Sequence, residues 1–95
     1  MVNMTLNEVI FTENLPKLDL HGYDRETARV ATNDFVRENV KLKNDIIVIV
    51  HGIGEHIVKN AVHETLKKNK NVEEYKLHMF NIGCTIVKLL LDNSK

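Results

Sequence analysis

The sequence predicts an α/β domain in which a mixed four-stranded sheet and two helices form a two-layer sandwich. Strand-like and helix-like segments alternate in the order β-α-β-α-β-β, and this alternation is typical of helices packed on a sheet. The run from Ile46 to Val50 consists only of β-branched residues, which suits a strand buried on both faces. The 95 residues are enough for one such domain with a single core.

An extra N-terminal strand or arm is expected to precede this core. Residues 5–11 have the composition of a weak edge strand or an ordered arm, and Pro16 separates them from the rest of the chain. The chain is therefore divided into an arm at 1–16 and a domain at 17–95. An exposed strand in the arm could pair with a second copy, so a homodimer through this strand is one expectation.

The domain is expected to open with a short strand over 17–20 that ends at His21. Asp24 suits the N-cap of the helix that follows, because its carboxylate can accept a hydrogen bond from the first helical turn. The apolar residues of this helix recur at helical spacing and define the face that packs on the sheet: Ala28, Ala31, Phe35, Val36 and Val40. The helix is expected to fade between residues 39 and 44.

The second half of the chain is expected to supply the remaining elements. A buried strand over 45–50 is followed by a turn and by a helix over 55–68, whose apolar residues form one stripe. Loosely alternating apolar residues predict a strand over 72–80. A loop at 81–84 then leads into a final strand over 85–91.

Composition narrows the class of protein. The chain has 13 Lys and Arg and 13 Asp and Glu, so its formal net charge is zero, and strong non-specific attraction to nucleic acid is not expected. No apolar run reaches the roughly 18 residues of a membrane span, and a signal peptide is not evident. Cys84 is the single cysteine, which excludes an internal disulfide. The simplest interpretation is a cytoplasmic protein with no membrane partner.

Asp19 and His21 are the first candidates for chemistry. They are two residues apart on the short strand, so their side chains share a face, while Leu18 and Leu20 point to the other face. The carboxylate could orient and charge the imidazole, which could then act as a general acid or base or neutralise a phosphate. The alternative is a histidine that only caps the following turn.

The segment His51-Gly52-Ile53-Gly54 is the second candidate. A glycine turn between a strand and a helix is a generic anion site, because backbone N–H groups and the helix dipole both favour a phosphate there. His51 lies at the end of the buried strand and could face the same pocket as Asp19 and His21, because strand ends of one sheet share an edge. A tight structural turn with a half-buried histidine is the alternative.

The remaining polar residues give weaker signals. His56, His63 and His78 are expected at the surface, and Cys84 is expected to be a small buried or turn residue. The sequence has no carboxylate cluster of the kind that holds two Mg²⁺ ions, so no cofactor is expected and a metal-free histidine mechanism is preferred, with Mg²⁺ as the open alternative. The aromatic residues are too dispersed for a base-stacking platform: Phe11, Tyr23, Phe35, Tyr75 and Phe80.

Three motifs in this order make the chain resemble the Smr domain, the small MutS-related family. Leu18–Gly22 matches a Leu-Asp-Leu-His-Gly strand end, and His51–Gly54 matches His-Gly-x-Gly before a helix. Gly83–Val87 matches a Gly-x-Thr-x-Val segment before the last strand. The resemblance covers residues 17–91 and has the expected elements between the motifs.

The resemblance implies a fold like the C-terminal domain of bacterial translation initiation factor three. It also implies binding of DNA or RNA, with nicking DNA endonuclease or RNA endonuclease activity. A non-catalytic nucleic-acid or protein-interaction module is the alternative function.

The family motifs carry roles over to particular positions. Asp19, His21 and His51 fall on catalytic positions of the first two motifs. Gly52 and Gly54 fall on the phosphate side of the second motif. Lys59 stands where the family often has an arginine on the second helix, and is a candidate contact to nucleic acid. The sequence departs from the family pattern where Glu55-His56 follows the second motif, and where the segment before Gly83 has few glycines.

Overall fold

The computed structural model describes residues 14–54 and 56–91. Its elements, in chain order, are β1 (Lys17–Asp19), α1 (Arg25–Lys41), β2 (Ile46–Val50), α2 (His56–Lys68), β3 (Val72–Leu77) and β4 (Cys84–Leu89). Most of the arm expected at 1–16, including the edge strand at 5–11 and with it the expected pairing of two copies, lies outside the described residues. None of the described helices is long and apolar enough to cross a membrane.

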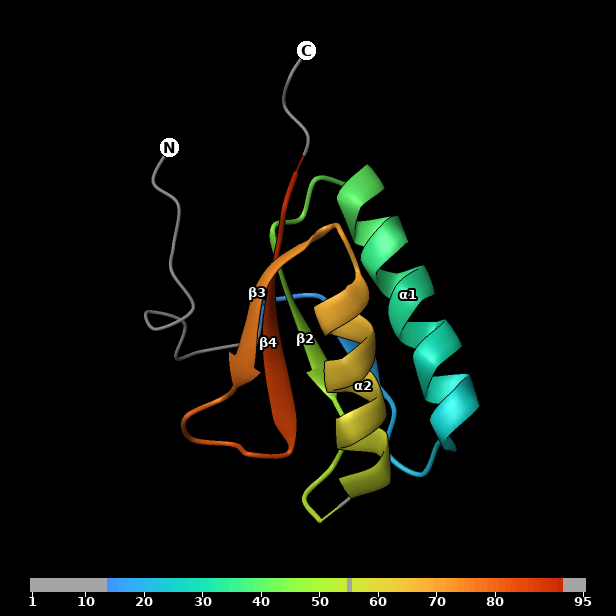
Figure 1. Ribbon diagram of the computed structural model, residues 1–95. Coiled ribbons are helices and arrows are strands. Elements are labelled where there is room, and N and C mark those ends of the chain that lie inside the picture. The colour runs from blue at the N-terminus through green and yellow to red at the C-terminus, as the bar shows by residue number, and fades with distance from the viewer. Residues whose placement is uncertain (1–13, 55, 92–95) are drawn as a thin grey trace.

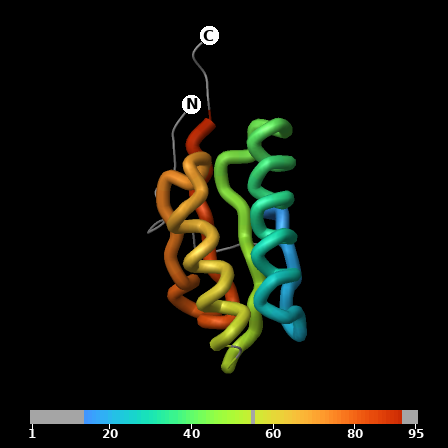
Figure 2. Tube along the Cα trace, turned by 45° about the vertical axis from the view of Figure 1, so that its right-hand side comes forward, coloured from blue at the N-terminus to red at the C-terminus, as the bar shows by residue number. Residues whose placement is uncertain are grey.

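The four strands form one mixed sheet in the order β1-β2-β4-β3. β1 runs parallel to β2, whereas β4 is antiparallel to both of its neighbours, β2 and β3. Both helices lie on the same side of this sheet (Figures 1 and 2). The predicted fold class is therefore confirmed.

The hydrophobic core lies between the sheet and the helix layer. Alternate residues of β2 and β4 face the helices, and Ile47 pairs in register with Val87 on this side. The core side chains are Leu20, Ala28, Val36, Ile47, Ile49, Val58, Ala61, Val62, Leu66, Val87 and Leu89. On the opposite face, Leu15 packs against Ile46 and Ile86. β2 is thus buried on both faces, as its β-branched composition predicts.

Local capping sets the ends of α1. The Asp24 carboxylate accepts a hydrogen bond of 2.7 Å from the backbone N–H of Thr27, so the predicted N-cap is confirmed. Near the other end, buried Asn39 donates to the Phe35 carbonyl and accepts from the Asn44 side chain. Helix α1 therefore ends at Lys41, inside the range where the sequence predicts that it fades.

The last two strands are shorter than the sequence predicts. β3 stops at Leu77 instead of continuing to residue 80, and β4 begins at Cys84 and ends at Leu89. The reason is a turn at 78–83, in which Nδ1 of His78 accepts hydrogen bonds from the backbone N–H groups of Phe80 and Asn81. These bonds draw the chain out of the sheet before the apolar alternation ends.

Three connections meet at one end of the molecule. The segments after β1, after β2 and between β3 and β4 all lie at the lower end in Figure 1. Backbone hydrogen bonds link these three segments. Leu20 N donates to Val50 O at 2.6 Å, and His51 N donates to Gly83 O at 2.9 Å. The three sequence motifs are therefore gathered at the same edge of the sheet.

Candidate functional site

Asp19 and His21 form a hydrogen-bonded pair at the surface. Oδ1 of Asp19 lies 2.7 Å from Nδ1 of His21 and also accepts the backbone N–H of His21 at 3.1 Å. The side chains are 60% and 72% exposed, respectively. The side-chain hydrogen bond with His21, helped by the backbone N–H, lowers the pKa of the Asp19 carboxyl. The two side chains pair, as predicted, but His21 lies in the turn after β1 and not on the strand, so a local turn and not strand alternation brings them together.

This arrangement suits proton transfer to or from a bound molecule. An anionic carboxylate that holds Nδ1 fixes the orientation of the imidazole and favours its charged form. The ring of His21 stands at the surface, directly beyond the carboxyl end of β1, where a ligand can reach it. The pair can therefore act as an oriented general acid or base.

The glycine turn after β2 is built against the third motif. Gly52 and Gly54 have φ angles of 94° and 82°, values that side chains disfavour. The backbone N–H of Gly52 donates to Gly83 O at 3.0 Å, next to the bond from His51 N. A Cβ atom at Gly83 would lie 3.2 Å from the carbonyl carbon of Gly52, so glycine allows this close approach. The N–H of Gly52 is thus engaged within the protein.

Lys59 lies beside this turn, on the first half of α2. Together with Gly52, Gly54 and Ile82 it lines a small open pocket of about 120 Å³, which His56 and Leu77 complete. Its ammonium group is close enough to the ring of His51 to lower the pKa of that histidine, after the larger effect of burial. The structure therefore brings Lys59 to the predicted phosphate side of the site.

His51 belongs to a buried polar cluster and not to the surface pair. Its Nε2 lies 2.8 Å from Oγ1 of Thr85, and Nε2 of His63 on α2 lies 2.8 Å from the same oxygen. In the neutral cluster the hydroxyl donates to one ring and accepts from the other. The ring of Tyr75 packs on His63 at 5.0 Å between centroids. This cluster links the end of β2 to β4 and α2, next to the glycine turn.

The expectation that His51 shares a pocket with Asp19 and His21 is not met. Asp19 pairs in register with Val50, and neighbouring side chains on a strand point to opposite faces. His51 follows Val50 and therefore faces the helices, where it is fully buried. Strand ends that share an edge can still present their side chains to opposite sides of the sheet.

The other expected surface residues divide into two groups. His56 is exposed, as predicted, and Cys84 is a buried free cysteine, also as predicted. Burial raises the pKa of the Cys84 thiol, which disfavours the reactive thiolate. The prediction is wrong for His78, which is buried and organises the turn at 78–83, and incomplete for His63, whose ring is half-buried in the cluster.

Sequence reasoning missed the partnership of His63 and Thr85. A signal for it does exist: Thr85 is the polar member of an inward-facing series that continues with Val87 and Leu89. A polar side chain in such a series requires a buried partner. His63 directly follows the buried Val62, at the border of the apolar stripe of α2.

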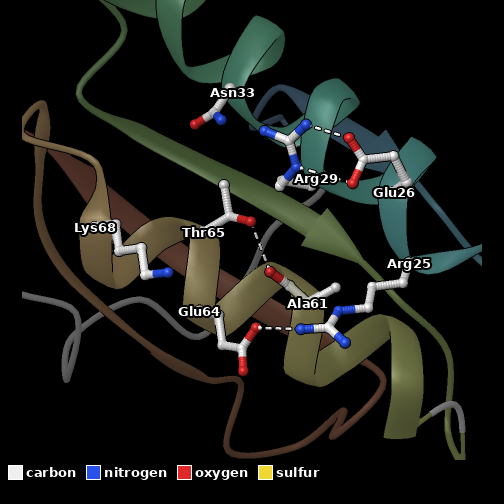
Figure 3. Close-up of a pocket in the computed structure, with 8 residues that line it drawn as sticks. All are labelled: Arg25, Glu26, Arg29, Asn33, Ala61, Glu64, Thr65 and Lys68. Carbon is white, nitrogen blue, oxygen red and sulfur yellow. Dashed lines mark hydrogen bonds and ion pairs between the residues drawn. The ribbon is translucent and has the colours of Figure 1, made fainter.

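A wider groove of about 500 Å³ lies between the two helices, away from the glycine turn. Arg25 of α1 reaches Glu64 of α2 at 3.4 Å across the groove, and Arg29 pairs with Glu26 one turn earlier on α1 (Figure 3). These arginines therefore face carboxylates, and the groove is not a bare basic surface. Among residues 14–54 and 56–91, no three His, Cys, Asp or Glu side chains are grouped to hold a metal ion.

Comparison with known proteins finds one family. The family model of the Smr domain matches residues 18–89 of this chain. The endonuclease MutS2 of Clostridium acetobutylicum is 33% identical over 75 residues, which are 76% of this chain and 10% of that protein. The endonuclease MutS2 of Streptococcus suis is 32% identical over 74 residues, 75% of this chain and 10% of that protein. The chain thus spans about one tenth of the length of these curated relatives.

Two solved structures have a similar fold. The Smr domain of Thermus thermophilus MutS2 superposes with a TM-score of 0.75 at 24% identity, covering 79% of this chain and 98% of that one. YdaL, a stand-alone small MutS-related protein from Escherichia coli, has a TM-score of 0.75 at 20% identity, covering 94% of this chain and 77% of that one. At these identities the similarity supports the fold alone.

The Asp19–His21 pair can be tested by titration. Because hydrogen bonds from His21 lower the pKa of the Asp19 carboxyl, His21→Ala is expected to raise that pKa toward the ordinary value of about 3.9. Carbon-13 NMR of the side-chain carboxyl over a pH series measures the shift. His56→Ala, which removes an exposed histidine on α2, is the matched control and should leave Asp19 unchanged. Identical Asp19 titrations in wild type and His21→Ala would show that the pair does not form in solution.

The buried cluster should make folding stability depend on pH. Burial, more than any neighbouring charge, lowers the pKa of His51 and of His63, so the unfolded chain binds more protons below the ordinary histidine pKa of about 6.5. The free energy of unfolding is therefore expected to be highest above that pH and to fall as the pH drops below it. Urea denaturation over a pH series measures this decline.

Two matched variants test whether the buried histidines cause this decline in the free energy of unfolding. His63→Gln keeps a polar side chain but removes one titrating ring, so the loss of stability toward acid should become shallower. His56→Gln alters an exposed histidine of the same helix and should retain the wild-type profile. The explanation fails if both variants follow the wild-type curve.

Proposed function

Because the chain belongs to the Smr domain family, we propose that it binds nucleic acid and cleaves its phosphodiester backbone by means of His21. The observation that carries this proposal is the oriented Asp19–His21 pair, which stands exposed at the same sheet edge as the glycine turn. The name of the MutS2 relatives, endonuclease, supports the same class of reaction. DNA and RNA are both candidate substrates.

Each residue of the surface site has a role in this proposal. His21 would take a proton from the attacking oxygen or give one to the leaving oxygen, and Asp19 would orient the ring and stabilise its charged form. Lys59, beside the turn, would neutralise a backbone phosphate. His51 is fully buried, so we assign it a positioning role, in which its ring supports the segment that carries Gly52 and Gly54.

The charge distribution favours a local contact over diffuse attraction. The formal net charge of the chain is zero, so few counterions would be released on binding and affinity would depend on particular groups. Lys59 is the cation that the pocket of about 120 Å³ places beside Gly52 and Gly54. Since Cys84 is a free thiol, which a reducing compartment preserves, we place this function in the cytoplasm.

A binding module without catalysis is the second candidate. It is favoured by the position of His51, whose ring faces the helices and leaves the Asp19–His21 pair without the second histidine that the family motifs suggest. In this case the same surface would capture a phosphate of DNA or RNA and release it unchanged.

Cleavage assays separate the two candidates. Incubation with single-stranded RNA and with supercoiled plasmid, each with and without Mg²⁺, is expected to yield cut product from the wild-type protein. Loss of a general acid or base costs about 100-fold or more in rate, so His21→Ala should be slower by that factor, and Asp19→Asn should be slowed to a lesser extent. The Mg²⁺ arms decide whether the reaction needs the metal.

Lys70→Ala is the control for these assays, because it removes an exposed side chain from the turn after α2, outside the pocket that contains Lys59. It should cut at the wild-type rate. Equal cutting by wild type and His21→Ala would remove His21 from the mechanism. Absence of product from the wild type on every substrate would leave the binding module as the function.

Binding is expected to depend on Lys59 more than on other lysines. Lys59→Glu places a negative charge at the lining of the pocket and should weaken binding of a labelled oligonucleotide by about tenfold or more at low salt. Gel-shift titration measures the change. Lys70→Glu makes the same charge change at an exposed turn after α2 and should have a much smaller effect, whereas equal losses would argue against a localised phosphate contact.

A further inference from the structure

A group of exposed apolar side chains borders the candidate site. Ile53 comes from the glycine turn, and Met79, Phe80 and Ile82 come from the segment between β3 and β4; each is more than half exposed, and Phe80 is 73% exposed. Single exposed apolar residues are ordinary, but a group of them marks a binding surface. These four residues are called the apolar rim.

The rim is one surface because its two segments are joined. His51 N and Gly52 N both donate to Gly83 O, and the side chain of Ile53 would come within 3.1 Å of a Cβ atom at Gly83. Both segments lie side by side at the lower end of the molecule (Figure 1). Ile82 also lines the small pocket that contains Lys59, so the rim continues into the phosphate side of the site.

Hydrogen bonds hold the rim in a defined shape. Nδ1 of buried His78 accepts the backbone N–H of Phe80 at 3.2 Å and that of Asn81 at 3.1 Å. Oδ1 of Asn81 accepts the N–H of Gly83, and the carbonyl of Asn81 accepts the N–H of Cys84, both at 3.0 Å. A segment held in this way presents its apolar side chains without a large loss of entropy on binding.

The groups in and beside the rim indicate which kind of partner fits it. An unpaired nucleic-acid strand alternates flat, apolar base faces with anionic phosphates, whereas a duplex hides its base faces in the stack. The rim offers an aromatic ring and aliphatic side chains, and the adjoining pocket offers the ammonium group of Lys59. A protein partner would need a carboxylate at one particular position to pair with this cation, whereas every nucleotide of an unpaired strand supplies an anion next to a base face.

We propose that the apolar rim binds the bases of an unpaired DNA or RNA strand, with Phe80 stacking on one base while Lys59 contacts a neighbouring phosphate. This inference rests on the proposed function and adds the substrate class to it. The dispersal of aromatic residues along the sequence does not oppose it, because one ring serves one base and Ile53 and Ile82 add exposed apolar surface to the rim. Unpaired strands would therefore be preferred over duplexes.

Fluorescence anisotropy of the full chain tests this preference. The His21→Ala protein is used throughout so that cleavage does not consume the probe, and the probes are a labelled single-stranded DNA, a single-stranded RNA and a blunt DNA duplex of equal length. Adding Phe80→Ala should weaken binding of the single strands by about tenfold and leave duplex binding unchanged. Leu42→Ala is the control, because Leu42 is equally apolar and exposed but follows the far end of α1.

A second variant reports stacking directly and does not depend on loss of function. The chain contains no tryptophan, so Phe80→Trp introduces a unique indole at an exposed position. Single-stranded oligonucleotides should quench its fluorescence and bind with at least wild-type affinity, and duplex should not quench it. Thermal unfolding of each variant checks that the fold is kept.

The outcomes separate this inference from the proposed function. Tighter binding of the duplex, or single-strand binding that Phe80→Ala leaves intact, would overturn the rim assignment and leave cleavage by His21 standing. No binding of any probe, together with absence of cleavage by the wild-type protein, would overturn both. Concentration-dependent self-association that Phe80→Ala abolishes, measured by size-exclusion chromatography, would instead make the rim an interface between copies of this chain.

Discussion

The backbone pairing of β2 is the constraint on which the rest of the structure depends. β2 is bonded to β1 on one side and to β4 on the other, and this pairing continues past the end of the strand. Val50 O receives the N–H of Leu20, and Gly83 O receives the N–H groups of His51 and Gly52. These bonds join three segments that are far apart in sequence, before any side chain of the site is considered.

A direct consequence is that His21, His51 and His63 lie on two different sides of the sheet edge, the first exposed and the others packed under α2. The pair of Asp19 and His21 stands on one side, where both side chains are exposed to solvent. The cluster of His51, Thr85 and His63 is packed under α2 on the other side, where burial disfavours charge on both rings. The proposed function therefore assigns chemistry to His21 and support of the turn to His51, although the sequence presents both in similar His-Gly contexts.

Much of this arrangement could be predicted from the sequence because strands and caps follow local rules. The β-branched composition identifies β2, and Asp24 suits a cap. Strand alternation predicts that Asp19 and His21 pair, and they do, but through the turn that follows β1. The face of the sheet on which the His51 side chain lies depends on the register of β2, because a shift of one residue would move it to the opposite face. The burial of His63 and His78 depends on contacts with Thr85 and with the backbone N–H groups of a distant turn. Such contacts have no local signature, so they require the assembled fold.

In the turn between β3 and β4, one set of residues fixes the backbone shape and another supplies the exposed apolar side chains. Its geometry is set by His78, Asn81 and Gly83 through bonds to backbone groups. The side chains at positions 79, 80 and 82 project outward and take no part in those bonds. Phe80 also makes an edge contact with the ring of His78, at 6.1 Å between centroids. Apart from this contact, the exposed side chains can change while the frame stays the same. In the proposed function, the turn would be a recognition element with a fixed backbone frame and exchangeable exposed side chains.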